Sequence, residues 1–222
     1  MYNFSYFKEK DKQTVLKFIE EHPFAFITGS YLSGKQVASQ IPILVEERQG
    51  ELFLQGHIMR NTDHHKAFVE NRNILIVFTG PSCYVSASWY TNPQIGSTWN
   101  YMSVHVTGEM NFMSDEELIQ FMRKLTLKFE NGNKQSLTFY DNLPDEFLNK
   151  MMPGIVGFEV KVSQIENVFK LSQNRDEKSY LTIISKLEEQ GGSSALIASE
   201  MKKRKAELFP PGVEWDASKF DS

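Results

Sequence analysis

The sequence contains a single cysteine, Cys83, among 222 residues. One cysteine excludes an internal disulfide and any zinc or iron–sulfur site that needs several cysteines. We interpret Cys83 as a small buried hydrophobic residue in a strand. No apolar run approaches the roughly 20 residues of a membrane span, and the first residues lack the basic region and apolar stretch of a signal peptide. These absences favour a cytoplasmic protein without a membrane span.

An excess of positive charge is also missing. Lys and Arg number 24 against 28 Asp and Glu, so the formal net charge is -4. Binding to nucleic acid or to an anionic membrane would therefore need a local basic patch. The sequence has no G-x-G-x-x-G, P-loop or G-x-S-x-G pattern and no internal repeat, which argues against the Rossmann, P-loop and serine-hydrolase classes.

Short apolar segments bounded by turn residues alternate with single helices, without the regular βαβ order of a parallel sheet. Strands are expected at 24–28, 36–45, 51–57, 74–78, 83–86, 99–113 and 154–168. Helices are expected at 11–21 and 62–69, after the Ser114–Glu117 capping box, after Leu143-Pro144, and at 176–189 and 193–208. Pro42 predicts an edge or a bulge in its strand. The pattern predicts an α+β protein, built on a small antiparallel β-barrel with peripheral helices.

The segment Gly56–Lys66 ends a strand and begins a helix. Free N–H groups at a helix start, with Arg60 and Lys66 beside them, suit a phosphate. Two other interpretations stay open for this segment. One is a solvated polar loop, and the other is a metal site that uses the histidines at 57, 64 and 65.

Aromatic residues, 13% of the chain, gather between Tyr84 and Tyr101. Ser88-Trp89-Tyr90 and Thr98-Trp99-Asn100-Tyr101 combine rings with hydroxyl and amide groups. Such a combination suits a planar heteroaromatic ring with polar edges. The alternative is an aromatic hairpin in the core or at a dimer interface.

Two further segments are candidates for function. The polar loop 170–175, with sequence KLSQNR, follows a strand and precedes a helix, so it is either part of a site or a capping loop. The last two helices resemble a helix-turn-helix with a basic run at 202–205. The second helix begins with Ser193-Ser194 and carries its charge at the end, which favours a plain helical hairpin.

Three blocks, Ser88-Trp89-Tyr90, Thr98-Trp99-Asn100-Tyr101 and KLSQNR at 170–175, closely resemble the PaiB family, the FMN-binding negative transcriptional regulators. Gly56-His57, Arg60-Asn61 and Gly80-Pro81 fit the same family. The resemblance covers roughly residues 1–187. It implies an antiparallel split β-barrel of the FMN-binding type, with peripheral helices and a C-terminal helical hairpin. It also implies a homodimer with FMN between the subunits, and contact with DNA.

Carried onto this sequence, the resemblance places Arg60, Asn61 and Lys66 by the FMN phosphate. The residues around the flavin would be Ser88, Trp89, Thr98, Trp99 and Asn100, with Asn174 and Arg175 closing the site, from the other subunit in one arrangement. The chain would divide into an FMN-binding domain at 1–175, a helical extension at 176–209 and a flexible tail at 210–222. No metal ligand and no catalytic residue is assigned.

Two positions depart from the family pattern. Gln40 stands where a histidine is expected, and Ala87 stands where a proline is common. The leading interpretation is an FMN-binding protein of PaiB type, in which a non-catalytic role is favoured. The alternatives are an FMN-dependent oxidoreductase, such as a flavin reductase or a pyridoxamine-phosphate-oxidase-like enzyme, and a non-catalytic flavin or haem carrier. In these the protein orients and tunes a cofactor that carries the chemistry.

Overall fold

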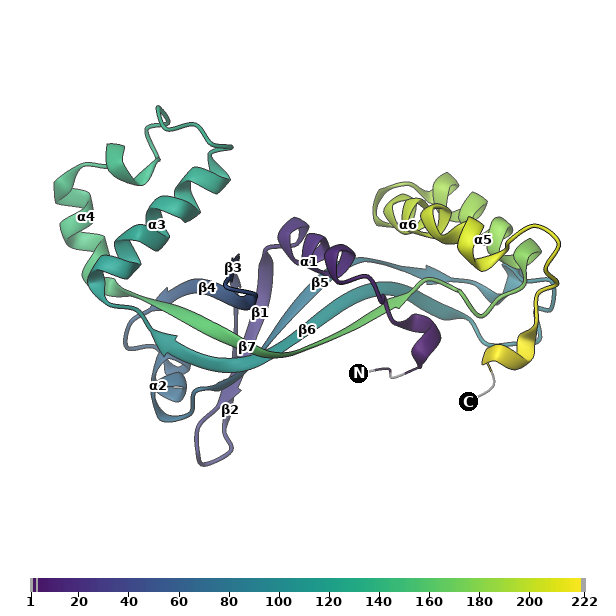
Figure 1. Ribbon diagram of the computed structural model, residues 1–222, viewed down its shortest axis with the longest axis horizontal. Coiled ribbons are helices and arrows are strands. Elements are labelled where there is room, and N and C mark those ends of the chain that lie inside the picture. Colours follow the sequence, from purple (N-terminus) through teal and green to yellow (C-terminus); the bar gives the residue numbers. More distant parts are fainter. Residues whose placement is uncertain (1, 3, 221–222) are drawn as a thin grey trace. The chain divides into compact units, whose positions relative to one another are not determined.

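The computed structural model describes residues 2 and 4–220 (Figure 1). Seven strands form one sheet in the order β2-β1-β5-β6-β7-β4-β3. The strands are β1 (Phe24–Ser30), β2 (Gln36–Pro42), β3 (Leu44–Arg48), β4 (Glu51–Met59), β5 (Asn73–Val85), β6 (Thr98–Phe112) and β7 (Ile155–Lys170). The helices are α1 (Lys12–Glu21), α2 (Asp63–Glu70), α3 (Asp115–Phe129), α4 (Asp145–Met151), α5 (Glu177–Gln190) and α6 (Gly192–Leu208). An antiparallel sheet with flanking helices confirms the predicted α+β class.

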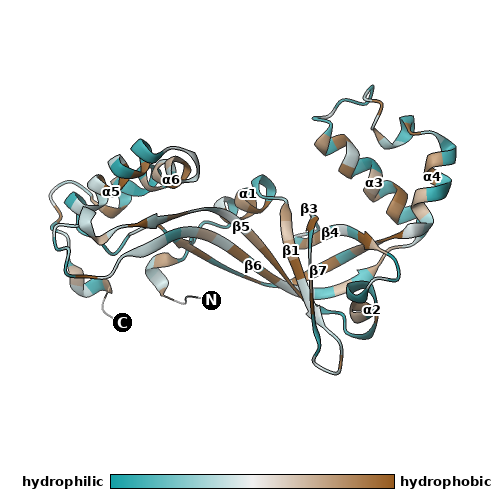
Figure 2. Ribbon diagram, turned by 180° about the vertical axis from the view of Figure 1, so that it is seen from behind, coloured by the Kyte–Doolittle hydropathy of each residue, from teal (hydrophilic) through white to brown (hydrophobic). Residues whose placement is uncertain are grey.

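Two compact units make up the chain. Unit 1 contains residues 1–18, 79–104 and 167–222, and unit 2 contains residues 19–78 and 105–166. Figure 2 shows that hydrophobic residues follow the strands, whereas the helices α5 and α6 carry many hydrophilic residues. Each unit is described below by itself.

In unit 2, helix α3 packs on a hydrophobic cluster. The cluster consists of Leu44, Leu118, Phe121, Leu125 and Ile155. The helix begins as the sequence predicts, because the Ser114 hydroxyl accepts from the Glu117 N–H and the Glu117 carboxylate accepts from the Ser114 N–H. This capping box fixes where α3 begins.

Strands β4 and β7 pair antiparallel over seven residues, from Phe53–Lys161 to Met59–Ile155. The backbones of β6 and β7 approach each other closely at Gly108. A Cβ atom at Gly108 would be 2.3 Å from the Lys161 carbonyl oxygen, so only glycine fits there.

The edge of the sheet differs in detail from the expected pattern. The stretch 36–45 forms two strands that separate at Ile43 rather than one, and β2 is an edge strand that ends at Pro42, as the proline predicts. A tight turn joins β3 to β4. Its two central residues are Gln49 and Gly50, both with positive φ (53° and 81°), as a two-residue hairpin loop requires.

In unit 1, helices α5 and α6 lie side by side as a helical hairpin, which confirms that prediction (Figure 1). Gly191, with φ of 72°, joins them. The Tyr180 hydroxyl, in a fully buried side chain, donates to the Met201 carbonyl at 2.9 Å and links the two helices. After α6, the Phe220 ring packs against Tyr6; Asp221 and Ser222, at the end of the expected flexible tail, lie outside the described residues.

Candidate functional site

Arg60, at the end of β4, is held by backbone carbonyls of unit 2. Its Nε atom donates to the Pro153 carbonyl at 3.1 Å, and one terminal nitrogen donates to the Ile155 carbonyl at 3.0 Å. These bonds fix the guanidinium where α4 leads into β7. A guanidinium has five N–H donors, so Arg60 retains donors for an anion.

The turn after Arg60 is tight. Asn61 has φ of 66°, a conformation that non-glycine residues seldom adopt. Its N–H donates to His65 Nδ1 at 3.1 Å, which requires that nitrogen to be unprotonated. Burial, aided by the charges of Arg60, His64 and Lys66, lowers the pKa of His65, which favours the neutral form of the imidazole.

The start of α2 is already capped. The Thr62 hydroxyl accepts from the His65 N–H, and the Asp63 carboxylate accepts from the His64 N–H at 2.7 Å. The expectation that free helix N–H groups would meet a phosphate is therefore wrong for these two groups. Lys66 is exposed in the first turn of α2, so side chains rather than the helix backbone offer positive charge here.

In unit 1, a short helical turn at 87–89 presents the aromatic segment. The Ser86 hydroxyl accepts from the Ser88 N–H, and the Ala87 N–H donates to Ser97 Oγ at 3.0 Å. Ser88 is exposed and Trp89 is half-buried. A proline at position 87 could not donate the bond to Ser97, so Ala87 supports a local contact that the common family residue would not make.

Trp99 and its neighbours on β6 point to opposite faces. Trp99 is 56% exposed, and its ring contacts the exposed Tyr84 edge-on at 6.3 Å between centroids. Thr98 and Asn100 alternate with it. Asn100 is fully buried, where its Oδ1 accepts from the Ser172 hydroxyl at 3.0 Å and its amide donates to Met201 Sδ at 3.6 Å. Trp99 therefore offers a ring surface, whereas Asn100 ties the polar loop to α6.

The loop 170–175 turns sharply at Ser172, where φ is 61°. The Arg175 N–H donates to the Ser172 carbonyl at 3.1 Å and closes the turn, and Lys170 Nζ donates to Thr98 Oγ1 at 2.6 Å. Asn174 is half-buried beside Arg175. Four non-glycine residues have a positive φ in the described part of the chain, and two of them, Asn61 and Ser172, lie in segments that the sequence singled out. Such strain is common at functional sites.

Arg175 lies over the ring of Tyr90, with 4.7 Å between the guanidinium carbon and the ring centroid. Burial raises the pKa of the Tyr90 phenol, and the nearby guanidinium opposes that rise. The Arg175 Nε atom is buried and has no hydrogen-bond acceptor among residues 2 and 4–220. A buried donor without an acceptor is costly, so a ligand that supplies an acceptor would be favoured here. The ring nitrogens and carbonyl oxygens of FMN are acceptors of this kind.

The predicted site residues thus fall into two groups. Within unit 2, Arg60, Asn61 and Lys66 surround His65. Within unit 1, the loop 170–175 is joined to Thr98 and Asn100 by hydrogen bonds. Sequence reasoning left out three residues that the structure connects to these positions: Tyr90, Lys170 and Ser172. Each lies inside a segment that the sequence marked as polar or aromatic.

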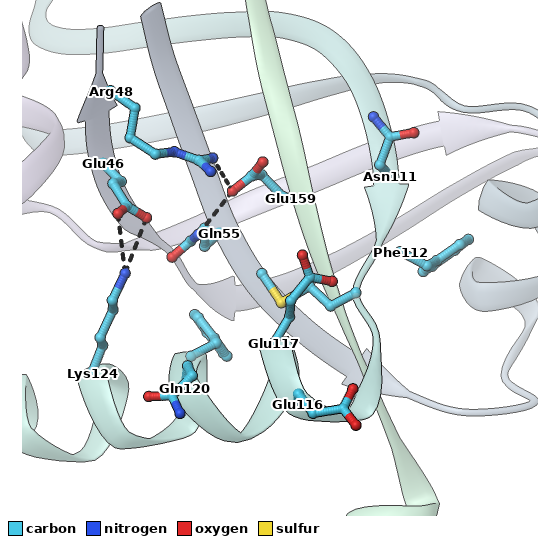
Figure 3. Close-up of a pocket in the computed structure, with 12 residues that line it drawn as sticks. Glu46, Arg48, Gln55, Asn111, Phe112, Glu116, Glu117, Gln120, Lys124 and Glu159 are labelled. Atoms are coloured by element: carbon cyan, nitrogen blue, oxygen red, sulfur yellow. Dashed lines mark hydrogen bonds and ion pairs between the residues drawn. The ribbon is translucent and has the colours of Figure 1, made fainter.

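Unit 2 has a cavity between α3 and the sheet and another beside Arg60. Figure 3 shows the smaller, of about 310 Å³, between α3 and the sheet. Several of its charges pair with one another, because Lys124 pairs with Glu46 at 3.1 Å and Glu159 accepts from both Arg48 and Gln55. The larger, of about 600 Å³, has Arg60 at its wall. Apart from Arg60, no predicted site residue lines either one.

Among the residues described, no group of three or more His, Cys, Asp or Glu side chains could hold a metal ion. No helix in the same part of the chain is long and apolar enough to cross a membrane.

Sequence comparison places this chain among flavin-related proteins. The model of a family described as "Putative FMN-binding domain" matches residues 1–164. The "Protease synthase and sporulation protein PAI 2" of Bacillus subtilis (strain 168) is 29% identical over 205 residues, which cover 92% of this chain and 98% of that protein.

Structural comparison gives the fold. The FAD and heme binding protein from Mycobacterium smegmatis has a TM-score of 0.56 at 16% identity, over 74% of this chain and 73% of that chain. The flavocytochrome Anf3 from Azotobacter vinelandii has a TM-score of 0.52 at 17% identity, over 82% and 78% of the two chains. These similarities confirm the predicted split-barrel fold.

Proposed function

This chain belongs to the FMN-binding domain family of PaiB type, with FMN as its cofactor, and we propose that it works as a homodimeric flavoprotein. The observation that carries the proposal is the buried Arg175 N–H without an acceptor, in the same unit as the exposed Trp99 ring. A flavin supplies what both need, a polar ring edge for the donor and a flat face for the indole.

We assign the cofactor-binding residues to two ends of FMN. Arg60, Asn61 and Lys66 would hold the phosphate, with two cationic side chains for a group of charge near −2. The bond from the Asn61 N–H to the His65 ring holds this strained turn in place. The ring end would be formed by Ser88, Trp89, Thr98, Trp99, Asn174 and Arg175, with Asn100 fixing the loop behind them.

Exposed aromatic residues support the homodimer. On β1, Phe24 is 57% exposed and Phe26 is 42% exposed, and both lie on the outward face of the strand. Large exposed rings on a sheet face are typical of an interaction surface. A second copy of the chain is the partner that the proposal needs, since the flavin would lie between the subunits.

We do not propose that α6 contacts DNA. Each basic residue of the run at 202–205 has an acidic partner: Lys202 pairs with Glu188, Lys203 with Glu200, Arg204 with Glu9 and Glu200, and Lys205 with Glu177. Paired cations have less charge to offer to phosphates, so we place flavin binding ahead of DNA binding.

We also propose a cytoplasmic location, because FMN is an intracellular metabolite.

The test compares FMN with riboflavin, which has the same ring system but lacks the phosphate. Fluorescence titration measures both affinities in the wild type and in Lys66→Ala. Loss of one charge-assisted contact, about 1.5–3 kcal/mol, should weaken FMN binding roughly 10- to 100-fold and leave riboflavin unchanged. Lys128→Ala, an exposed lysine on α3 of the same unit, is the control. Equal losses for both flavins in Lys66→Ala would refute the phosphate assignment.

A further inference from the structure

Two cations of unit 1, Lys170 and Arg175, lie at the two ends of the loop between β7 and α5. Both are partly buried. Among residues 2 and 4–220, no carboxylate lies within ion-pair distance of either one. Partly buried cations normally have a carboxylate partner, because removal of a charge from water is costly.

Lys170 is surrounded by groups that do not neutralise it. Its ammonium donates one hydrogen bond, to Thr98 Oγ1 at 2.6 Å. It also lies 5.0 Å from the Tyr2 ring centroid and 5.8 Å from the Phe7 ring centroid. An ammonium has three N–H groups, so two of them have no partner among residues 2 and 4–220 and could serve a ligand. Burial, with a smaller contribution from Arg175, lowers the pKa of Lys170.

Arg175 lies against the Tyr90 ring, and its Nε atom is the buried donor without an acceptor. The adjacent carboxylate, Asp176, is fully occupied elsewhere. It accepts from the Ser179 N–H at 2.9 Å, from the Ser179 hydroxyl at 2.6 Å and from the Thr91 hydroxyl at 2.9 Å. The chain thus has a carboxylate beside Arg175 and uses it to begin α5.

The other partly buried guanidinium of unit 1 shows the contrast. Arg204, whose side chain is 15% exposed, forms ion pairs with Glu9 at 2.9 Å and Glu200 at 2.8 Å. Among its described residues, unit 1 therefore supplies two carboxylates to the arginine that stabilises α6 and none to Lys170 or Arg175. Binding of an anionic ligand would explain why these two positive charges lie on one loop without a carboxylate beside them.

The loop also holds the two cations in place. Ser172 keeps a positive φ, its hydroxyl donates to the buried Asn100, and its carbonyl accepts from the Arg175 N–H. A strained turn with these bonds fixes Lys170 and Arg175 before any ligand arrives, which lowers the entropy cost of binding.

We propose that Lys170 and Arg175 form a binding site for an oxyanion, the carboxylate or phosphate group of a small aromatic ligand, with the rings of Tyr2, Phe7 and Tyr90 alongside. This site deepens the proposed function, since Arg175 also belongs to the flavin end, and it adds an anionic second ligand or substrate beside the cofactor. Only the position of the flavin beside this site depends on the proposed function; the two cations are observed independently of it.

The test is a calorimetric titration of the full chain with benzoate and, separately, with inorganic phosphate, which distinguishes the two anion sources. Each titration is made without flavin, with saturating FMN and with saturating riboflavin. Saturable binding of at least one anion is expected in all three, with at least a tenfold loss of affinity in Lys170→Met. Lys170→Arg should retain binding, and Lys178→Met, an exposed lysine on α5, should match the wild type.

A second readout separates binding from folding. The pKa of Lys170, followed by NMR of the lysine side chains, should rise when the anion binds, because a nearby negative charge favours the ammonium form. Three results would overturn the proposal: no saturable binding of either anion, unchanged affinity in a folded Lys170→Met variant, or loss of anion binding with FMN but not with riboflavin. The last would assign these cations to the phosphate of FMN, and failure of FMN to bind would leave the FMN-free titration intact.

Discussion

Replacement of Asp176 by alanine should destabilise unit 1, because this half-buried carboxylate accepts several hydrogen bonds. The carboxylate caps α5 through the Ser179 N–H and also accepts from the hydroxyls of Ser179 and Thr91. Thr91 follows Tyr90, so Asp176 connects the helical hairpin to the aromatic segment. Its loss removes a cap and two charge-assisted bonds together.

The magnitude follows from these contacts. Loss of an N-cap costs about 1 kcal/mol, and the bond from the buried Ser179 hydroxyl to a charged acceptor contributes about 1.5 kcal/mol. Thr91 is exposed, so its bond adds only about 0.5 kcal/mol. Asp176→Ala should therefore lower the free energy of unfolding by about 3 kcal/mol. Asp176→Asn retains an oxygen for the cap and should lose about 1 kcal/mol.

The effect should depend on pH. Burial alone would raise the pKa of Asp176, but the hydrogen bonds from Ser179 and Thr91 outweigh it, so the pKa lies below its ordinary value. A carboxyl group with a lowered pKa stabilises the fold above its unfolded pKa of about 3.9 and loses that contribution as the pH falls through the folded value. The difference between the wild type and Asp176→Asn should thus be full at pH 7 and shrink below about pH 3.9.

Urea unfolding followed by tryptophan fluorescence measures this, because Trp89, Trp99 and Trp215 all belong to unit 1. With a slope of roughly 2 kcal/mol per molar, the midpoint of Asp176→Ala should fall by about 1.5 M urea. The control, Glu177→Ala, removes an exposed 3.7 Å ion pair with Lys205 and should cost below about 0.5 kcal/mol. A midpoint for Asp176→Ala equal to that of the control would refute the reasoning.

A substitution at Gly108 tests the packing of unit 2, and alkylation of Cys83 tests the packing of unit 1. Gly108→Ala should destabilise unit 2 by more than about 2 kcal/mol, because the new Cβ would meet the Lys161 carbonyl oxygen at 2.3 Å. A thermal melt followed by circular dichroism measures the loss. The control is Gly154→Ala, whose Cβ would meet no atom within 4 Å. Cys83 is buried, which raises the pKa of its thiol to about 11, so its thiolate fraction at pH 8 is about 100-fold below that of a thiol with the ordinary value of 9.0. Alkylation by iodoacetamide should be correspondingly slow and should speed up about tenfold from pH 8 to pH 9; a rate equal to that of free cysteine would contradict the burial.

Local signals in the sequence predict much of the fold. The Ser114–Glu117 capping box fixes the start of α3, and Pro42 marks an edge strand, because both effects act within a few residues. The split at Ile43 was not predicted. An apolar run continues through it, and only pairing of the two halves with different strands, β1 and β4, separates β2 from β3.

The site was less predictable, since its contacts join distant parts of the chain. The resemblance names Arg60, but its bonds to the carbonyls of Pro153 and Ile155 span more than 90 residues and leave no local pattern. Asn100 looked like a ring contact because it follows Trp99, yet strand alternation turns it into the core under α6. The structural role of Asn100 and the proximity of Lys170 to Thr98 needed tertiary pairing to become visible.

The arrangement of charge explains how an acidic protein can bind anionic ligands. The net charge is -4, so long-range attraction does not bring an anion to the surface. The basic run of α6 is occupied by acidic partners, which weakens it as a DNA-binding surface. Lys170 and Arg175, which have no acidic partner within the described part of the chain, instead lie on one partly buried loop. In that environment a charge interacts more strongly with a ligand than it would in water. Recognition of small anions therefore depends on a few positioned cations rather than on the total charge, and a variant such as Lys170→Met changes binding without a large change in the overall field.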